Sequence, residues 1–320
     1  MKAIVSAKYG SPEVLELKEV EKPVPQDNQV LVKVHAASLN FGNLVLLKGE
    51  PFLARFAFGL TKPKFPIPGG DVAGRVEAVG KDVTQFKPGD EVYGDLASSG
   101  WGSFAQYVAV PESALANKPV NLSYEEAAAV PMAAVTALQA LRDKGNIQSG
   151  HKVLVYGSSG GVGTFAVQIA KSYGTEVTAV CSTRNVDIAK EIGADHVIDY
   201  KREYFKNHKQ QYDLILGTNG SQPISVYKSK LTPGGVFVHV GGSGSQMFNT
   251  MVRGITNRKK IKTFLQRPNQ NDLIIMKELI EAGKVKPVID RRYKLDEIQQ
   301  AFAYFAEGHA QGKVVVNCLM

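Results

Sequence analysis

The first 110 or so residues alternate between apolar and polar positions in short runs, which is the pattern of strands with one buried face. Turns rich in glycine and proline separate the runs, as at Lys87-Pro88-Gly89-Asp90. Many short strands joined by such turns indicate a barrel-like or sandwich-like β domain. The predicted strands cover residues 2–7, 14–18, 29–36, 73–79, 91–93 and 104–110.

The pattern changes near residue 121, where Ser123 and Glu126 have the spacing of a helix capping box. We predict a helix over 127–130, which Pro131 ends, and a second helix over 133–143. After residue 150, strand-like runs alternate with helical segments, which predicts a parallel sheet with helices on both faces. The predicted strands are 152–156, 176–181, 196–199, 213–216, 236–240 and 261–265, and the predicted helices are 162–173, 186–192, about 221–230 and about 246–257.

The last part of the chain has a mixed pattern. Amphipathic helices are predicted at 271–282 and 295–305, followed by an apolar strand at 314–316. We expect this strand to rejoin the first domain, which is then built from both ends of the chain. Residues 51–68 have no regular pattern and predict a long functional loop. Its prolines are Pro51, Pro63, Pro66 and Pro68.

Composition places the chain among globular proteins. Its 320 residues suit two domains, and 44% hydrophobic with 21% charged residues is an ordinary globular balance. No apolar run approaches the roughly 20 residues that span a bilayer, so no transmembrane segment is expected. Cys181 and Cys318 are too few for a disulfide framework or a cysteine-rich zinc site. A reducing, cytoplasmic location is the resulting expectation.

The formal net charge of +8 points to nucleic acid, an anionic membrane surface or an anionic cofactor as a partner. The densest basic stretch, Arg253–Lys262, lacks the interleaved aromatic residues that stack on bases. We therefore expect no nucleic-acid partner and interpret most of the charge as a solvated basic surface.

A glycine-rich turn follows the predicted strand 152–156 and opens the helix after it. In a dinucleotide site, glycines let the backbone approach the pyrophosphate, and the helix N-terminus offers free N–H groups and a positive dipole end. Ser158 stands at the first glycine of the usual motif, whereas the later glycines are kept. The residues predicted to hold the pyrophosphate are Gly160, Gly161, Val162 and Gly163.

The end of the next strand favours NADPH over NADH. NAD sites place an acidic residue about 20 residues after the glycines, where it binds the ribose 2′-hydroxyl. This chain has Ser182 and Arg184 in that region and no acid. A guanidinium suits a 2′-phosphate through charge-assisted hydrogen bonds, and Lys201 is a candidate for a second charge.

Several short motifs along nearly the whole chain are characteristic in combination. On them the chain resembles the medium-chain dehydrogenases/reductases, and within these the zinc-independent quinone oxidoreductase branch. The resemblance implies an α/β fold with a GroES-like, β-rich catalytic domain at 1–120 and 285–320 and a doubly wound Rossmann domain at 121–284. It also implies a nicotinamide site between the domains and a homodimer. The motifs are residues 37–40, 69–74, 86–92, 128–131, 136–141, 159–163 and 312–315.

The family's zinc ligands are missing from this sequence. The resemblance matches Asn40 to a ligand cysteine and Gly70 to a ligand histidine, with Asp71 next, and the structural-zinc cysteines have no counterpart. No metal is therefore expected. A quinone or an enone accepts hydride without a Lewis acid, since it is already electrophilic, whereas oxidation of a simple alcohol needs the metal.

The resemblance also implies roles for single residues. Asn40 and Thr136 are the candidate catalytic residues. Tyr200, Val240, Gly241, Gly242 and Lys313 join the glycine turn, Ser182 and Arg184 as candidate cofactor-binding residues. Phe41, Phe52, Phe56 and Trp101 are candidates for an apolar substrate pocket.

The sequence therefore predicts a zinc-independent, NADPH-dependent oxidoreductase that transfers hydride to a small-molecule quinone or activated double bond. Three alternatives stay open. An enone or 2-alkenal reductase would use the same site as a quinone reductase. An NADPH-binding protein with an RNA- or membrane-associated role fits the positive charge. A zinc alcohol dehydrogenase is disfavoured by the missing ligands.

Overall fold

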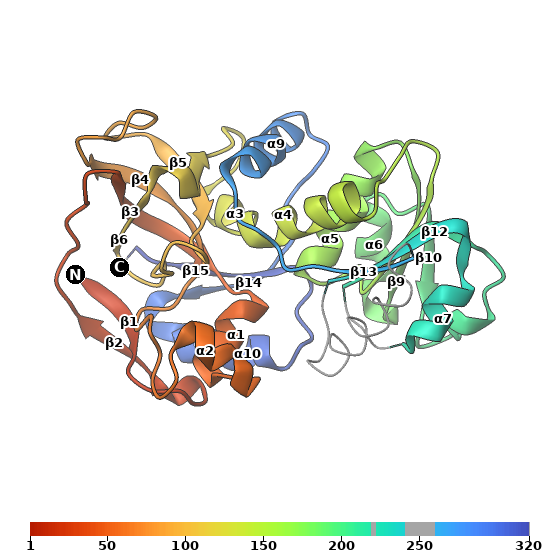
Figure 1. The fold of residues 1–320 in the computed structure, drawn as a ribbon, viewed down its shortest axis with the longest axis horizontal. Helices are drawn as coiled ribbons and strands as arrows, with labels where there is room; N and C mark the ends of the chain where they lie inside the picture. The colour runs from red at the N-terminus through yellow and green to blue at the C-terminus, as the bar shows by residue number, and fades with distance from the viewer. Residues whose placement is uncertain (219–221, 241–259, 320) are drawn as a thin grey trace. The chain divides into compact units, whose positions relative to one another are not determined.

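The computed structural model describes all residues except 219–221, 241–259 and 320 (Figure 1). The chain forms two compact units, each assembled from more than one stretch of sequence. Unit 1 contains Met1–Ala133, Arg267–Ala282 and Pro287–Met320, and unit 2 contains Ala134–Gln266 and Gly283–Lys286.

The sheet of unit 1 joins the two ends of the chain. Strand β3 (Gln29–Ser38) pairs antiparallel with β4 (Asp71–Val79) on one side and with β15 (Lys313–Asn317) on the other. Val315 lies opposite Ser38 in this register. The expectation that the last strand rejoins the first domain is confirmed. The apolar residues that alternate along these strands form the core of the unit.

The other strands of unit 1 complete this sheet and a small hairpin. The order across the sheet is β14-β15-β3-β4-β5-β7, and β6 also pairs with β3. The hairpin consists of β1 and β2, paired antiparallel. Their bounds are β1 Lys2–Ser6, β2 Leu15–Glu19, β5 Glu91–Asp95, β6 Tyr107–Pro111, β7 Leu115–Asn117 and β14 Ile289–Lys294.

The loop predicted over residues 51–68 is partly helical. Helix α1 (Phe41–Lys48) precedes it, and the loop contains the 3-10 turn η2 (Phe52–Ala54) and the short helix α2 (Arg55–Phe58). The proline-free stretch between Pro51 and Pro63 has room for these turns, so the prediction of an entirely irregular loop was wrong. The remaining helix of this unit near the C-terminus is α10 (Ile298–Ala306), preceded by η7 (Leu295–Glu297).

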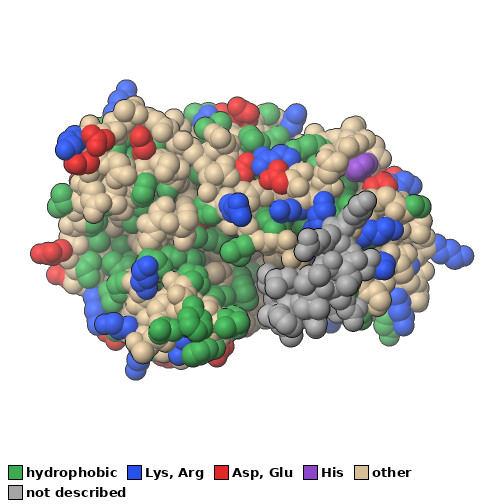
Figure 2. Space-filling model, viewed as in Figure 1, with side chains coloured by type: hydrophobic (Ala, Val, Ile, Leu, Met, Phe, Trp, Pro, Cys, Tyr) green, Lys and Arg blue, Asp and Glu red, His purple; other side chains and the backbone are tan. Residues whose placement is uncertain are grey.

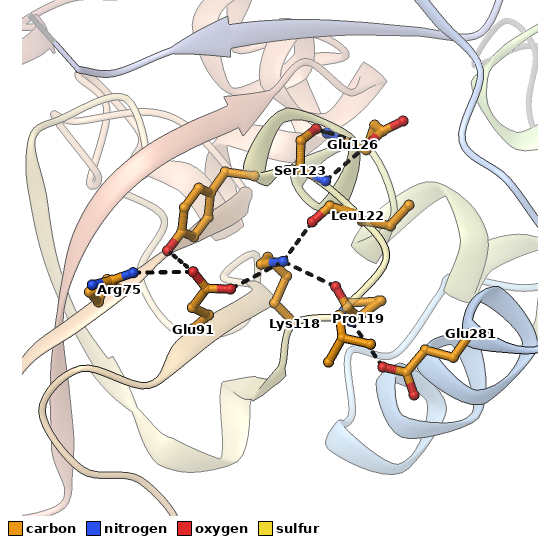
Figure 3. A network of polar contacts seen from close by, with 10 residues as sticks. Arg75, Glu91, Lys118, Pro119, Leu122, Ser123, Glu126 and Glu281 are labelled. Carbon is orange, nitrogen blue, oxygen red and sulfur yellow. Dashed lines mark hydrogen bonds and ion pairs between the residues drawn. The ribbon is translucent and has the colours of Figure 1, made fainter.

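A polar network ties two helices of unit 1 to its sheet (Figure 3). Glu91 of β5 accepts hydrogen bonds from the Tyr124 hydroxyl at 2.6 Å and from Arg75 at 3.3 Å, and pairs with Lys118 at 3.2 Å. Tyr124 begins α3 (Tyr124–Ala128). Glu281, which ends α9 (Gln270–Glu281), accepts from the Val120 N–H at 2.9 Å.

These contacts place α3 and α9 in unit 1, whereas the predicted boundaries put both in the Rossmann domain. The buried Tyr93 hydroxyl also donates to the Leu273 carbonyl at 2.6 Å, which fastens α9 to β5. Pro131, predicted to end a helix, instead begins the next helix α4 (Pro131–Gln139). A proline suits a first helical position because no intrahelical partner is lost there.

Unit 2 contains the predicted parallel sheet (Figure 1), and the expected fold class is confirmed. In the described residues the strand order is β10-β9-β8-β11-β12-β13, and each pairing is parallel. This is the order of a doubly wound dinucleotide-binding fold. The strands are β8 Lys152–Tyr156, β9 Glu176–Cys181, β10 His196–Asp199, β11 Tyr212–Gly217, β12 Leu231–His239 and β13 Ile261–Thr263.

Helices of unit 2 follow the strands as the sequence predicts. Among the described residues, the helices that follow strands of this sheet are α5 (Gly161–Ser172), α6 (Val186–Glu191) and α7 (Ile224–Ser229). The helix predicted at about 246–257 lies outside the described residues.

Candidate active site and cofactor site

A buried ion pair lies at the centre of the candidate active site in unit 1. The ammonium of Lys313, at the start of β15, is 3.3 Å from a carboxylate oxygen of Asp71, at the start of β4. The Lys313 and Asp71 side chains are 2% and 0% exposed. The same ammonium donates to the Leu39 carbonyl at 3.0 Å and to the Asn40 side-chain oxygen. The ion pair therefore has polar partners on both members, as a buried charge requires.

Asp71 collects hydrogen bonds from several elements. One carboxylate oxygen accepts from the Ser38 hydroxyl and from Asn40 Nδ2, each at 2.7 Å. The other accepts from the backbone N–H of Met132, in the first turn of α4, at 2.9 Å. The free N–H groups of a helix N-terminus are natural partners for a carboxylate. Asp71 thus links the end of β3 to the beginning of α4.

Asn40 is held at both polar atoms of its amide. Its oxygen accepts from Lys313, and its nitrogen donates one N–H to Asp71. An amide nitrogen carries a second N–H, which these contacts leave available. Burial lowers the pKa of the Lys313 ammonium, while the carboxylates of Asp71 and Asp95 oppose that shift.

Trp101 covers the glycine that replaces a zinc ligand in the family pattern. A Cβ on Gly70 would come within 3.2 Å of the indole and 3.1 Å of the Met132 methyl, and a Cβ on Gly42 within 3.1 Å of the indole. Trp101 itself has φ of +63°, which is unusual for a bulky residue and is found mainly at constrained functional positions.

Two buried donors beside this cluster lack partners. In the part of the chain that the structure describes, neither Trp101 Nε1 nor Asn43 Nδ2 has a hydrogen-bond partner. Buried polar groups are nearly always hydrogen-bonded, and exceptions call for an explanation such as a ligand. Asn43 belongs to α1 and binds the Asn40 N–H through its oxygen at 2.7 Å.

The other residues predicted for the substrate pocket are on the surface. Phe41, Phe52 and Phe56 are 64%, 63% and 69% exposed, whereas Trp101 is buried. The exposure of Phe52 and Phe56 does not favour their predicted place in a pocket wall. Phe41 directly follows Asn40 and stays a prediction.

The glycine turn of unit 2 has the close packing that a dinucleotide site needs. Gly157, after β8, has φ of +84°, and Gly160 caps helix α5. A Cβ on Gly163 would lie 2.1 Å from the Gly157 carbonyl, so only glycine fits there. A Cβ on Gly160 would meet nothing nearer than 3.8 Å. The surface above Gly160 is therefore open at a helix N-terminus.

The residues predicted to recognise a 2′-phosphate follow neighbouring strands. Asp199 of β10 lies opposite Cys181 of β9, so Ser182 and Tyr200 leave the same edge of the sheet. The Tyr200 N–H donates to the Cys181 carbonyl at 3.0 Å. Arg184 is exposed in the turn after β9.

Asn185 joins this edge to the glycine turn. Its Nδ2 donates to the Ser159 hydroxyl at 2.7 Å, and its buried Oδ1 has no partner in the described residues. Sequence reasoning missed this residue.

The remaining candidate residues are placed as follows. Thr136 is buried on α4, and Val240 follows β12 with its N–H bound to the Gly217 carbonyl at 2.9 Å. Gly241 and Gly242 lie outside the described residues. Sequence reasoning identified Asn40 and Lys313 separately, but it missed their link through Asp71, although Asp71 belongs to a recognised motif.

Comparisons with known proteins support this reading of the fold. Residues 26–120 match the family described as alcohol dehydrogenase GroES-like domain, and residues 192–316 match the family described as zinc-binding dehydrogenase. The chain is 37% identical over 316 residues to the chloroplast envelope quinone oxidoreductase homolog of Arabidopsis thaliana. The aligned region covers 95% of this chain and 94% of that protein.

A second relative and a solved structure are similar to this chain over nearly its whole length. The chain is 36% identical over 331 residues to 2-methylene-furan-3-one reductase of Solanum lycopersicum, with 99% of this chain and 79% of that protein covered. The structure of the quinone oxidoreductase from Coxiella burnetii has a TM-score of 0.88 and 30% identity, with 99% of each chain covered.

The chain belongs to the medium-chain dehydrogenase/reductase superfamily, and it is an oxidoreductase of that superfamily. The resemblance drawn from the sequence motifs is thereby confirmed. Among the described residues, no helix is long and apolar enough to cross a membrane. Cytoplasmic location and dimerisation stay predictions.

The ion pair in unit 1 leads to a stability prediction. Lys313→Met leaves the Asp71 carboxylate buried without its counter-ion, so we expect the free energy of unfolding to fall by about 3–5 kcal/mol. The double variant Asp71→Asn/Lys313→Met removes both charges and recovers most of that loss. Urea unfolding followed by the fluorescence of Trp101, the one tryptophan of the chain, reports on unit 1 directly.

The matched control is Lys81→Met, which breaks the exposed Lys81–Asp27 pair. Exposed pairs contribute little, so this change is expected to stay below about 1 kcal/mol. Equal losses in Lys313→Met and Lys81→Met would contradict the role given to the buried pair.

Proposed function

We propose that this protein is an NADPH-dependent reductase that works without zinc and delivers hydride to a quinone or to an activated carbon–carbon double bond. The observation that carries the proposal is the buried cluster of Asn40, Asp71 and Lys313, beside which Trp101 and Asn43 keep unpartnered donors. Such a cluster suits an acceptor oxygen better than a metal ion.

The residues present do not fit zinc. Gly70 offers no ligand, and Trp101 and Met132 fill the space beside it. The Asp71 carboxylate is engaged by an ammonium, and a second cation there would be repelled. In the described residues, no group of three or more His, Cys, Asp and Glu side chains could hold a metal ion. The name of the matched zinc-binding family therefore supports the fold of this chain and not a metal site.

The residues of unit 2 fit a phosphorylated dinucleotide. The open N-terminus of α5 at Gly160 suits the pyrophosphate, and Arg184 with Ser182 suits a 2′-phosphate. No carboxylate follows β9 to bind a 2′-hydroxyl, since the residues there are Ser182, Thr183 and Arg184. Bound NADPH supplies the hydride.

The chain's own contribution in unit 1 is to position the acceptor and to stabilise the oxyanion that forms on it. We assign the hydrogen bond to the acceptor oxygen to the indole N–H of Trp101, with the second N–H of Asn40 as a further donor. Asp71 and Lys313 are positioning residues, because they fix both polar atoms of Asn40. Donors fixed in advance stabilise developing charge without reorganisation.

The acceptor class follows from this donor arrangement. A quinone and an enone both carry an oxygen that becomes negative when hydride adds to the conjugated carbon framework. As part of the proposal we assign Thr136 and Val240 to the nicotinamide, Tyr200 to the adenosine, and Phe41 to the apolar wall of the acceptor site. Phe52 and Phe56 are left out of the acceptor site because their rings are exposed.

The function is tested by turnover of metal-free protein, its zinc content checked by elemental analysis. NADPH and NADH oxidation is measured with a benzoquinone, phenanthrenequinone, a 2-alkenal and a simple ketone. We expect turnover with the quinones or the alkenal, faster with NADPH, and none with the ketone. NADPH binding without turnover of any acceptor would replace the reductase by a binding role, and activity that requires added zinc would restore the alcohol dehydrogenase reading.

Arg184 provides a cofactor prediction. Arg184→Gln removes a charge-assisted hydrogen bond to the 2′-phosphate, so the Kd for NADPH should rise about 10–100-fold while that for NADH stays nearly constant. Fluorescence titration with each cofactor measures both values. Lys190→Gln, an exposed charge on α6, is the control. Equal weakening of NADPH and NADH by Arg184→Gln would exclude a 2′-phosphate contact.

Trp101 provides a catalytic prediction. Trp101→Phe keeps an aromatic ring over Gly70 but removes the N–H, and kcat/KM with a quinone should fall on the order of 10²-fold with NADPH affinity unchanged. Met132→Leu is the control, because its side chain borders the same glycine without a polar hydrogen. If both variants keep full kcat/KM, the donor lies elsewhere.

A further inference from the structure

Unit 1 displays a group of apolar side chains on its surface, over η2 and α2. Phe52, Leu53, Phe56 and Leu60 are 63%, 74%, 69% and 56% exposed, and we call them the apolar patch. Figure 2 shows apolar side chains gathered over α1 and α2 with basic side chains beside them. At roughly 100–150 Å² for each mostly exposed aromatic ring, the patch reaches several hundred Å², the size of the largest apolar patch on a typical monomer, which is often functional.

The patch is held in place by ordered contacts. The Arg55 Nε donates to the Gly49 carbonyl at 3.1 Å, and its guanidinium lies 4.6 Å from the centre of the Tyr9 ring. The Tyr9 hydroxyl donates to the Gly59 carbonyl at 2.5 Å. Arg55 and Tyr9 thus fasten the segment from its inner side.

The rings of the patch are ordered too. Phe52 and Phe56, one helical turn apart, meet edge to face with centroids 6.2 Å apart. Because the segment is folded, its apolar side chains are exposed in a defined arrangement.

The charged residues of the segment that carries the patch are almost all basic. Between residues 41 and 64 the basic residues are Lys48, Arg55, Lys62 and Lys64, and Glu50 is the one acid. Within the described chain, Lys48, Lys62 and Lys64 are exposed and have no carboxylate partner. Exposed Phe and Leu flanked by Lys and Arg is the composition of segments that bind at a lipid headgroup boundary.

We propose that this segment docks the protein on membranes rich in anionic lipid. The phenylalanine and leucine side chains enter the boundary between headgroups and acyl chains, and the lysines bind lipid phosphates. A protein partner is less favoured because a segment with nearly one-sided positive charge and exposed apolar side chains matches a uniformly anionic surface. This inference does not depend on the proposed reductase activity.

Vesicle co-sedimentation tests the proposal. The intact protein is mixed with vesicles of phosphatidylcholine alone or with phosphatidylglycerol added, at rising salt. We expect binding to the mixed vesicles that weakens with salt, and weak binding to phosphatidylcholine. Leu53→Ser/Leu60→Ser and Lys62→Glu/Lys64→Glu should each lower the partition coefficient on the order of 10-fold.

Matched controls change exposed residues elsewhere. Val120→Ser/Leu265→Ser removes two apolar side chains that are 82% and 85% exposed. Lys190→Glu/Lys209→Glu makes the same charge change as the lysine variant within unit 2. Both controls should bind vesicles nearly as the unmodified protein does. Binding losses equal to those of the patch variants would overturn the proposal.

Two further outcomes would also overturn the membrane proposal, because each would assign the apolar patch to a different binding partner. If Leu53→Ser/Leu60→Ser converts a dimer into a monomer in light scattering, the patch is a contact between copies of the chain. If Phe52→Ser/Phe56→Ser raises KM for a short-chain quinone but leaves vesicle binding unchanged, the two rings belong to the acceptor site.

Discussion

The buried attraction between Asp71 and Lys313 is the constraint on which the candidate active site depends. A carboxylate and an ammonium without access to water are tolerated only when each has a full set of polar partners. Here those partners are Ser38, Asn40, the Leu39 carbonyl and the Met132 N–H. Meeting that requirement fixes the starts of β4, β15 and α4 together with the end of β3. The orientation of the Asn40 amide follows from the same set of contacts.

Unit 2 follows a different principle, because the path of its backbone, and not side-chain charge, determines the geometry of the candidate cofactor site. Close approach of Gly163 to the Gly157 carbonyl lets helix α5 begin directly behind β8. The parallel order of β8, β9 and β10 then delivers the turns after them to one edge. Side chains such as Arg184 and Tyr200 need only be added to these turns. Under the proposed function, cofactor selectivity therefore depends on a few residues in these turns and not on the fold.

Sequence periodicity predicted most of the fold because strand alternation and the glycine turn are local patterns. The predictions were weakest where proline was interpreted by itself. Pro131 begins α4, and the stretch between Pro51 and Pro63 contains two short helical turns. Asn40 and Lys313 were found through family motifs, but their joint contact with Asp71 was not. No local sequence pattern predicts a contact between residues 242 positions apart. The unpartnered donors on Trp101 and Asn43 likewise depend on packing that no pattern in the sequence contains.

That long separation has a consequence for how the protein is made. Asp71 leaves the ribosome 242 residues before its counter-ion. At roughly 5–20 residues per second, the interval lasts on the order of 10–50 s. All of the unit 2 sequence is translated within it, because that sequence lies between the first and last of the three parts of unit 1. During synthesis the Asp71 carboxylate must stay solvated, and the sheet of unit 1 stays without β15. The nascent chain thus completes the sequence of unit 2 first, and the buried cluster of unit 1 closes last.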